Sequence, residues 1–586
     1  MKANKLTETR TFVTNQDVAV KDGVYGIYKL VDKRLVFCPK GSAVYIEEVW
    51  DFIDDGQKVL KLYFFDAKGK KQTVEFPRKN LTEQGVLELL GRGVQVDKKT
   101  AYILVASIMN QEPEAEVKCY HNTLGFFWID EKTVFLGAEA IGTKSTYNGN
   151  LCIGTHGSKD AWKQMVEEEV VGYTPMEFVL AVAGGGILVD YLREKVGVEN
   201  LIVHLVSESS TGKSSAGYLL VSCGAKPSFT NSTIGNFSDT TNAIMASIKS
   251  SYPYLLDEGS LWKSGRNCTS FLYELSMGSE RKRLTKELNT KEGAHFNTAI
   301  LITSEKSLLN YADENTGLLV RNIEIENVTF TKSADSADRI KRVTQNNYGF
   351  LIPMLAQHII NLEEAGKGCV LVNRFQEICK EMIVESKEKG KYNPFTERVT
   401  KQYALIILSA ELINDILGIS LNIQGIKEFL ECHSLVDDPA RADISKRALV
   451  FLIEYVSRYY AYFQTDSSED IQRDCRGKIK KTKSVRLVTG EFSNYEVHVS
   501  EISLEEILQA GGFPEKKIIL KKWKEQGYLN CEKDRFVSDI VVASGMQFKG
   551  YKIRIPEQMS GDGFIPISDS ENPFLENNRK IERRDA

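Results

Sequence analysis

The sequence predicts a multidomain α/β protein with a parallel sheet at its centre. Its 586 residues exceed what one hydrophobic core organises, so we expect three or four domains. Between about residues 200 and 325, short apolar runs alternate with stretches of helical periodicity. That alternation is the order which parallel strands and their crossover helices produce.

Residues 1–165 predict a β-rich N-terminal accessory domain. Runs such as GVYGIYKL and KVLKLYFFD are β-branched and aromatic, and clusters of Gly, Asp and Lys separate them. The stretch GFFWIDEKTVFLG, Gly125 to Gly137, indicates a hairpin that turns at Asp130–Lys132.

Residues 166–345 predict the parallel core. An apolar helical segment, Met176 to Leu192, precedes the strand LIVHLV, and YPYLLDE, TAILITSE and GLLVRNIEI supply three further strands. Residues 346–438 are helical, and their apolar periodicity is clearest from Val399 to Leu417. We therefore expect a helical lid after the core and a mixed domain in residues 439–586.

Composition excludes several classes of protein. The ten cysteines are scattered without a CxxC pair, which indicates neither a zinc site nor a disulfide framework. The longest uncharged apolar run, Phe178 to Val189, has twelve residues and is too short to span a bilayer. No signal-peptide core is seen in the first thirty residues, so a reducing cytoplasm is the expected location. The net charge of −4 confines any nucleic-acid binding to local basic patches.

The stretch SESSTGKS, Ser207 to Ser214, matches a phosphate-binding loop except at its first residue. The usual pattern, G-x-x-x-x-G-K-[ST], has glycine where this sequence has serine. The substitution is tolerable if residue 207 does not take a positive φ, because the interior N–H groups form the anion cradle. The alternative is a plain helix cap, in which Ser210 or Thr211 caps a helix that begins near Lys213.

The position of this loop favours nucleotide binding. It follows an apolar strand and opens a helix, so backbone N–H groups and the positive helix end point toward an anion. Lys213 would reach the β- and γ-phosphates, and Ser214 would hold Mg²⁺. The predicted nucleotide-binding residues are Ser210, Thr211, Gly212, Lys213, Ser214 and Ser215.

Acidic residues supply the second half of the predicted site. The strand YPYLLDE ends in Asp257, which would orient Mg²⁺ or its water, and Glu258, which would polarise the attacking water. The alternative is two solvated acids at a strand end. The strand TAILITSE ends in Ser304 and Glu305, and one of these two would position the lytic water.

The motifs SSTGKSS, YLLDE, MGSERKR, ILITSE and LLVRN resemble, in this order, the family called domain of unknown function 927. They are especially similar to the MCM-like AAA+ helicases of staphylococcal cassette chromosomes and pathogenicity islands. The resemblance covers roughly residues 120–420. It implies an AAA+ P-loop ATPase core in a hexameric replicative helicase.

The same resemblance assigns roles to two arginines. Arg321 would be the arginine finger that reaches into the neighbouring subunit's site, and the alternative is a surface arginine at a strand start. Arg398 would be the sensor-2 arginine, and the alternative is a solvating charge on a helix face.

A basic stretch follows the acid pair. By resemblance, SERKRLTKELNTKEGAHF carries a hairpin that projects into a central pore and tracks the phosphates of single-stranded DNA. The alternative is an ordinary charged helix surface. The candidate DNA contacts are Arg281, Lys282, Arg283, Lys286 and Lys291, with Lys286 and Lys291 at the tip.

The C-terminal region predicts a winged-helix-like domain. Two short helices and the strands DRFVSDIVV and GYKIRIP follow a basic run, Arg473 to Arg486, which we interpret as a solvated linker with a DNA contact as the alternative. The lysines that could face DNA are Lys516, Lys517, Lys521, Lys522 and Lys524.

Together these features predict an ATP- and Mg²⁺-dependent DNA helicase of a mobile element, acting as a ring on single-stranded and forked DNA with possible replication accessory proteins. A protein remodeller or loader of the AAA+ class is the first alternative, but its pore loop should be aromatic and hydrophobic rather than basic. A nucleotide-gated DNA-binding switch is the second, but it would lack the trans-acting arginine and the water-polarising acid.

Overall fold

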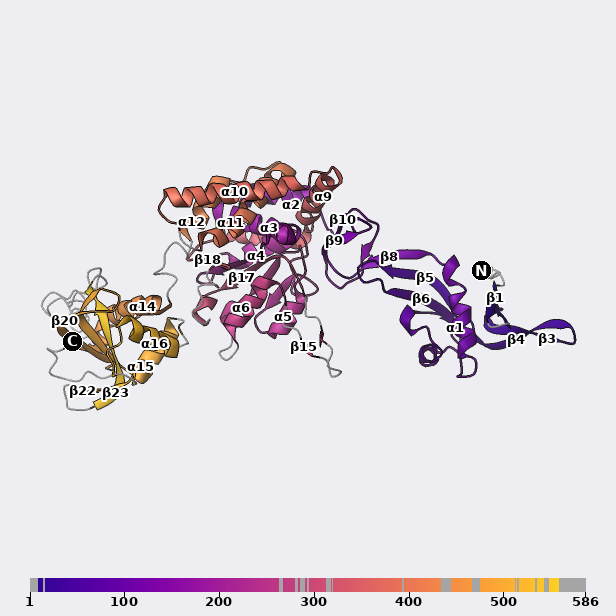
Figure 1. The fold of residues 1–586 in the computed structure, drawn as a ribbon, viewed down its shortest axis with the longest axis horizontal. Helices are drawn as coiled ribbons and strands as arrows, with labels where there is room; N and C mark the ends of the chain where they lie inside the picture. The colour runs from indigo at the N-terminus through magenta and orange to yellow at the C-terminus, as the bar shows by residue number, and fades with distance from the viewer. Residues whose placement is uncertain are drawn as a thin grey trace.

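The computed structural model describes most of the chain between residues 9 and 557. Figure 1 shows a β-rich region at the N-terminal end, a central α/β region with a helical layer above it, and a mixed region at the C-terminal end. The described residues are 9–13, 16–262, 267–279, 283–284, 290–291, 295–311, 318, 320–392, 395–433, 444–465, 475–511, 513, 516–532, 535–541 and 547–557.

The N-terminal region contains two sheets and a short hairpin. The first sheet is antiparallel and has the order β1-β2-β3-β4. The second sheet has the order β11-β8-β5-β6-β7. The helix α1 (Ala101–Met109) packs its apolar residues into their shared core. The strands are β1 (Thr9–Val13), β2 (Gln16–Lys21), β3 (Val24–Val31), β4 (Arg34–Ser42), β5 (Tyr45–Phe52), β6 (Lys58–Phe65), β7 (Lys71–Pro77), β8 (Val117–His121) and β11 (Thr146–Tyr147).

The hairpin predicted at residues 125–137 is confirmed. Strands β9 (Gly125–Ile129) and β10 (Lys132–Leu136) are antiparallel, with Lys132 opposite Ile129. Asp130 and Glu131 both have positive φ, 50° and 60°, which is the conformation a two-residue hairpin turn needs.

The central sheet is parallel throughout and has the order β13-β14-β17-β12-β18. The four predicted strands are present, and β17 lies between β12 and β14 as the motif order requires. The fifth strand, β13, was not predicted because it has three residues in a polar, Gly-containing stretch. The strands are β12 (Leu201–Val206), β13 (Ile234–Asn236), β14 (Tyr254–Asp257), β17 (Ala299–Ser304) and β18 (Asn322–Glu326).

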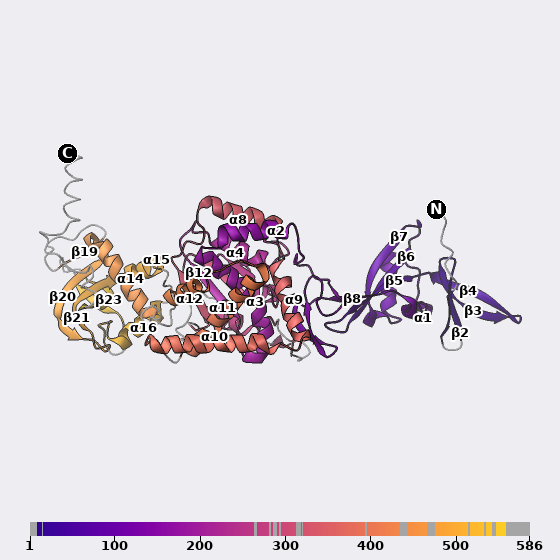
Figure 2. The same cartoon turned by 90° about the horizontal axis from the view of Figure 1, so that it is seen from above.

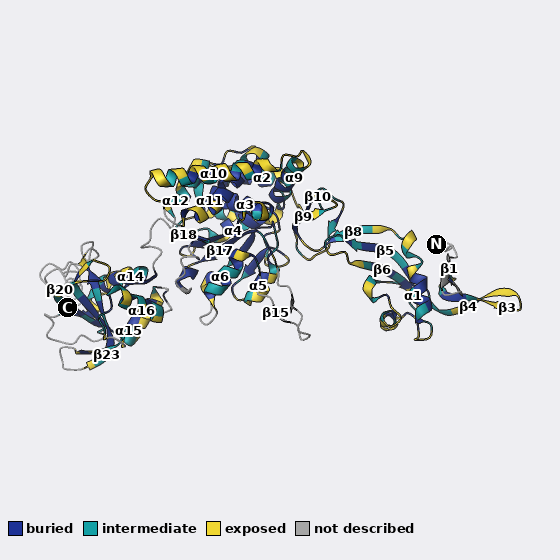
Figure 3. Cartoon of the chain, in the orientation of Figure 1, coloured by how far each residue is buried: buried dark blue, intermediate teal, exposed yellow. Residues whose placement is uncertain are grey.

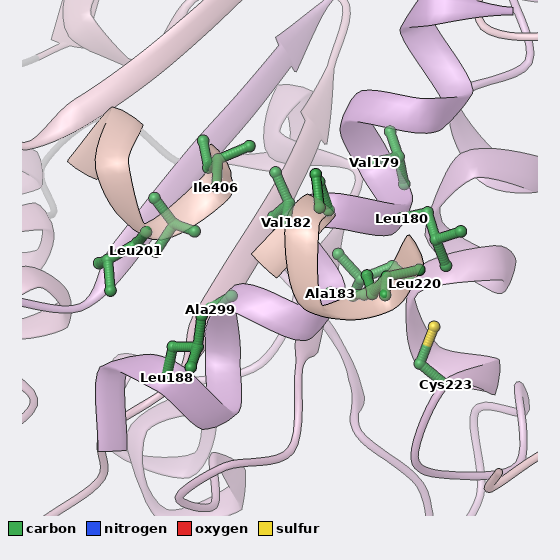
Figure 4. Close-up of a cluster of buried hydrophobic side chains, with 14 of the residues drawn as sticks. Val179, Leu180, Val182, Ala183, Leu188, Leu201, Leu220, Cys223, Ala299 and Ile406 are labelled. Atoms are coloured by element: carbon green, nitrogen blue, oxygen red, sulfur yellow. The ribbon is translucent and has the colours of Figure 1, made fainter. Parts of the chain in front are cut away.

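Helices cover both faces of this sheet. α3 (Thr174–Val196) lies against it with α11 (Thr396–Leu417) behind, and Figure 4 shows Val182, Leu201 and Ile406 in their common apolar cluster. α3 is long and apolar enough to cross a membrane by length and composition, but 89% of its apolar window is buried inside the fold. Figure 3 shows the same core as a continuous buried region. α3 is therefore a core helix of this fold.

The remaining core helices form two groups. Figure 2 places α8, α2 and α4 on one side of α3 and the long α10 on the other. α5 and α6 pack against the opposite face of the sheet in a second apolar cluster. The helices are α2 (Lys159–Met165), α4 (Lys213–Ser222), α5 (Thr241–Ser247), α6 (Cys268–Met277), α8 (Ala334–Asn346), α9 (Leu351–Glu364), α10 (Cys369–Glu388) and α12 (Ile423–Cys432).

The C-terminal region has its own core and a five-stranded sheet of order β19-β20-β21-β23-β22. The interpretation of the basic run as a linker is wrong from residue 477 onward, where it forms strand β20 and pairs with β21. Its lysines hid the pattern, because Ile479 turns inward while Lys480 is exposed. The elements are α14 (Ile444–Arg458), β19 (Phe463–Gln464), β20 (Gly477–Arg486), β21 (Phe492–Ser500), α15 (Glu501–Ala510), α16 (Lys516–Gln526), β22 (Ser538–Val541) and β23 (Gln547–Pro556).

Candidate functional site

A cleft of about 800 Å³ opens at the carboxyl ends of β12, β14 and β17. In open parallel sheets this edge is where ligands bind. The loop before α4, the acids after β14, the end of β17 and the first turns of α8 form its walls. The polar residues among them include Ser209, Ser210, Thr211, Lys213, Ser214, Asp257, Glu258, Thr303, Glu305, Lys332 and Lys341.

The loop before α4 is built to expose backbone N–H groups. α4 begins at Lys213, and Gly212 precedes it as an N-cap whose φ is 86° and which supplies no side chain. Thr211 does not cap the helix, because its hydroxyl donates to the carbonyl oxygen of Glu208 at 3.0 Å. The first N–H groups of the helix therefore have no intrahelical partner where they meet the cleft.

The structure also explains the serine in place of the first glycine. Left-handed backbone occurs at Ser210 and Gly212, with φ of 66° and 86°, and Ser207 is not among the positive-φ residues. Ser207 instead continues β12, since its N–H donates to the carbonyl oxygen of Ser304 at 3.2 Å. Its buried hydroxyl lies 2.6 Å from the Thr211 hydroxyl. The condition under which serine is tolerated here is met.

Lys213 lies over the loop. Its Nζ donates to the carbonyl oxygens of Ser207 at 2.5 Å and Glu208 at 2.7 Å. Burial lowers the pKa of Lys213, and the nearby carboxylates of Glu305 and Asp257 act in the opposite direction. A bound phosphate can take the place of these neutral carbonyl oxygens and give the lysine a charged partner.

The two serines after Lys213 differ. Ser214 is exposed and lines the cleft. Ser215 is buried, and its hydroxyl donates to the carbonyl oxygen of Ala337 at 3.2 Å. Of the two side chains, that of Ser214 is available to a ligand, whereas that of Ser215 joins α4 to α8.

The acid pair sits opposite the loop. Asp257 accepts a hydrogen bond from the Thr303 hydroxyl, and Glu258 is exposed with a φ of 59°. A non-glycine residue in that conformation is uncommon and recurs at functional sites. The Asn236 amide, at the end of β13, donates to Glu258 Oε2 at 3.3 Å. Thr303 and Asn236 are contacts that the sequence did not single out.

The sequence left the choice between Ser304 and Glu305 open, and the structure gives these two residues different surroundings at the end of β17. Ser304 lines the cleft but is buried, and its hydroxyl lies 2.6 Å from His204 Nε2 and donates to the carbonyl oxygen of Lys306 at 2.6 Å. Glu305 is exposed and accepts a hydrogen bond from the Ser209 hydroxyl. Glu305 therefore touches the loop, while the hydroxyl that touches Asp257 belongs to Thr303.

The two predicted arginines lie elsewhere. Arg321 precedes β18 at the amino edge of the sheet, where it forms an ion pair with Glu199. Arg398 is exposed in the first turn of α11 and is not among the residues that line the cleft. Two lysines near α8 line it, namely Lys341 and Lys332, whose Nζ donates to the carbonyl oxygen of Glu168 at 2.8 Å.

The basic stretch after α6 forms two short strands. β15 (Arg283–Leu284) and β16 (Thr290–Lys291) are antiparallel, with Arg283 opposite Lys291. This is the backbone of a hairpin rather than of a charged helix. The prediction that Lys291 lies at the tip is wrong, because this residue pairs with Arg283 within strand β16. Figure 1 shows β15 below the core, away from the helical layer. Arg281, Lys282 and Lys286 lie outside the described residues.

The lysines of α16 are not equivalent. Lys517 and Lys521 are exposed and one helical turn apart. Lys516 pairs with Glu505 at 2.6 Å, and Lys524 lies 5.4 Å above the Phe536 ring. Lys522 is partly buried, which lowers its pKa. The exposed cationic face of this helix is therefore narrower than the sequence indicated.

These features define a multidomain α/β protein with a parallel sheet, a loop-and-helix cleft at its carboxyl edge and a separate C-terminal domain. The family model described as domain of unknown function 927 matches residues 24–295, and the model described as Cch helix turn helix domain matches residues 443–558. The two family models match in this order, which confirms the resemblance indicated by the motifs.

A solved structure has a similar fold. A structure described as the active helicase Cch of SCCmec type IV is 19% identical, with 94% of this chain and 99% of that chain covered and a TM-score of 0.60. The apo C-terminal region of NrS-1 matches at 12% identity over 65% of this chain and 90% of that chain, with a TM-score of only 0.22. No match was found among curated proteins.

Proposed function

We propose that this chain is an ATP-dependent DNA helicase of the AAA+ type, which translocates on single-stranded DNA as a ring-shaped oligomer during replication of a mobile genetic element. The observation that carries the proposal is that Lys213 at the start of α4, Asp257 at the end of β14 and Thr303 on β17 line one cleft, on a sheet whose order puts β17 between β12 and β14.

The residues of the cleft divide the chemistry of hydrolysis among them. The loop N–H groups and Lys213 bind the β- and γ-phosphates of ATP, and Glu258 polarises the attacking water. Ser214 and Asp257 suit Mg²⁺, because this ion is typically held by one or two carboxylates together with substrate phosphates. When bound, Mg²⁺ would neutralise phosphate charge. Thr303 orients Asp257 through its hydroxyl, and Asn236 holds the Glu258 carboxylate.

Two features outside the cleft support work on DNA, and a third supports assembly into an oligomer. The β15–β16 hairpin carries Arg283 and Lys291, cations that can follow a phosphate backbone without reading sequence. The C-terminal domain matches a helix-turn-helix model, and α16 exposes Lys517 and Lys521. Arg321 stands at the edge opposite the cleft, where a neighbouring copy could approach it.

A second candidate function, a nucleotide-gated DNA-binding switch, is favoured by two contacts between the core and the C-terminal domain. Lys306 Nζ, just past the end of β17, donates to the carbonyl oxygen of Gln509 at 3.3 Å. Arg447 Nη2 lies 3.1 Å from Glu326 Oε1 at the end of β18. A nucleotide that moves the carboxyl edge of the sheet would therefore shift the helix-turn-helix domain.

The experiment that separates these functions measures ATP hydrolysis and strand separation on a forked substrate, each with and without single-stranded DNA. A helicase shows DNA-stimulated hydrolysis and unwinds the fork. A switch hydrolyses slowly, does not unwind, and changes its duplex affinity with the bound nucleotide. Hydrolysis that survives in Lys213→Ala would refute both proposals.

A further inference from the structure

Arg321 cannot act on the cleft of its own chain. β18 runs parallel to β12 from Asn322 to Glu326, so Arg321 lies at the amino edge of the sheet while the loop follows the carboxyl end of β12. A strand advances about 3.3 Å per residue, which puts roughly 17 Å of sheet between the two. Any nucleotide that Arg321 serves is bound by another copy.

Glu199 holds the Arg321 side chain at this edge. Arg321 Nε lies 2.8 Å from Glu199 Oε2, and Nη2 donates to Oε1 at 3.0 Å. The guanidinium carbon also lies 5.1 Å from the centre of the Tyr273 ring. Two contacts to one carboxylate fix both the direction and the plane of an arginine. The pair is 15% and 31% exposed, so it can be reached from the surface.

Asn200, the next residue, fastens the base of the basic hairpin. Its buried amide nitrogen donates to the carbonyl oxygen of Leu275 at 2.8 Å, and its Oδ1 accepts from the Thr298 N–H at 3.0 Å. Its backbone N–H donates to the carbonyl oxygen of Ser276 at 3.0 Å. Leu275 and Ser276 end α6 before the hairpin, and Thr298 follows it. One residue therefore joins both ends of the hairpin segment to the sheet.

We propose that Glu199 is a positioning residue that pairs with Arg321 until a nucleotide is bound in the neighbouring copy. The guanidinium then leaves Glu199 and pairs with a phosphate of that nucleotide. A phosphate can accept two hydrogen bonds from one guanidinium and carries more negative charge than a carboxylate. Glu199 and Asn200 are adjacent residues just before β12. Release of Arg321 therefore frees the segment that anchors the hairpin. This inference rests on the proposed function, since it needs a phosphate site in a second copy.

The test replaces Glu199 by glutamine, which keeps the shape and one acceptor but removes the charge. We expect turnover without DNA to rise about fivefold in the assembled protein, the factor that corresponds to about 1 kcal/mol for a partly exposed ion pair. Stimulation by single-stranded DNA should fall by a similar factor, and the KM for ATP should stay unchanged. Glu194→Gln, an exposed acid in the last turn of α3, is the matched control and should behave as wild type.

A double variant separates positioning from a merely structural role. In the Arg321→Ala background, Glu199→Gln should change turnover no further, because its only proposed effect passes through that arginine. The proposal is overturned if Glu199→Gln matches its Glu194→Gln control, or if it lowers turnover as Arg321→Ala does. Lys213→Ala is measured alongside: if it still hydrolyses ATP, the nucleotide site is wrong. If it is inactive while Glu199→Gln has no effect, only the reserve role of Glu199 is wrong.

Discussion

The two edges of the parallel sheet carry opposite kinds of polar chemistry. At the carboxyl edge, Lys213 and the loop line an open cleft, and carbonyl oxygens hold the lysine. At the amino edge, Arg321, Asn200 and Asp190 are paired with charged or amide groups of the protein itself. One sheet thus separates a side that opens to a ligand from a side where these three residues are already paired within the protein. Lys213 thus faces a cleft that can hold a ligand, whereas Arg321 is paired with a carboxylate of the protein.

The largest effect is expected at the carboxyl edge. Lys213→Ala should abolish ATP turnover and leave the fold intact, because its ammonium donates to loop oxygens, namely the carbonyls of Ser207 and Glu208 and the Ser207 hydroxyl, and supports no core packing. Phosphate release measures the turnover, and a thermal unfolding curve checks the fold. Lys226→Ala, an exposed lysine beyond α4, should leave both unchanged. Turnover retained in the Lys213 variant would mean that the cleft is not a nucleotide site.

Arg321→Ala tests whether the amino edge serves another copy. We expect nucleotide binding to survive and assembled turnover to fall by about 10³-fold or more, the range for arginines acting in trans. Mixing this variant with Lys213→Ala should restore some interfaces that have one intact loop and one intact arginine. Stable mixed oligomers without any recovery would show that Arg321 does not act in trans.

A smaller effect concerns pH and the amino edge. Asp190 is buried and accepts hydrogen bonds from Ser251, Asn297 and the N–H of Phe126, yet burial raises its pKa to about 6. A pKa above the ordinary value means that this group favours the fold below about pH 4. That contribution is lost as the pH rises through about 6.

Asp190→Asn should remove this pH dependence. Between pH 4 and pH 7 the wild type should lose about 2 to 3 kcal/mol of unfolding free energy that the variant keeps. Denaturant unfolding at the two pH values measures the difference. The same loss in both proteins would place the pH sensitivity elsewhere.

The smallest effect on basal turnover is expected at the hairpin. Replacing Lys286 and Lys291 by alanine should leave basal turnover normal and lower the salt dependence of single-strand binding, by about 0.7 in the log–log slope for each lost phosphate contact. DNA stimulation and unwinding should be lost. Substituting Lys517 and Lys521 should instead weaken duplex binding and spare translocation on a loaded strand. A double hairpin variant that unwinds at the wild-type rate would contradict the helicase proposal.

Local patterns predicted the carboxyl edge well. The loop, the strand before it and the acid strand are each continuous in sequence, so apolar runs and spacing were enough to identify them. The choice between Ser304 and Glu305 at the end of β17 stayed open in the sequence because it concerns one step of strand register. Thr303 turns toward Asp257 and Ser304 toward His204, and side-chain alternation along a strand is fixed only when its neighbours are known.

The partners at the amino edge could not be predicted in the same way. Arg321 and Glu199 are 122 positions apart, and Asn200 reaches Leu275 and Thr298 across the whole hairpin segment. Such contacts depend on how β12, α6 and β18 pack, which no local pattern records. The lysines of α16 show the same limit, since the Glu505 partner of Lys516 lies on a different helix.

The burial of α3 has a consequence for synthesis of the chain. Gly184 lies so close to α11 that a Cβ there would collide with Ser409 and Ile413, so this apolar helix is fully covered only after residue 413 has been made. About two hundred residues separate the two helices along the chain, and contacts of that range form late. A nascent chain that stalls or ends before Thr396 therefore exposes an apolar helix of membrane-spanning length. We expect a chaperone to bind the exposed helix of such a chain.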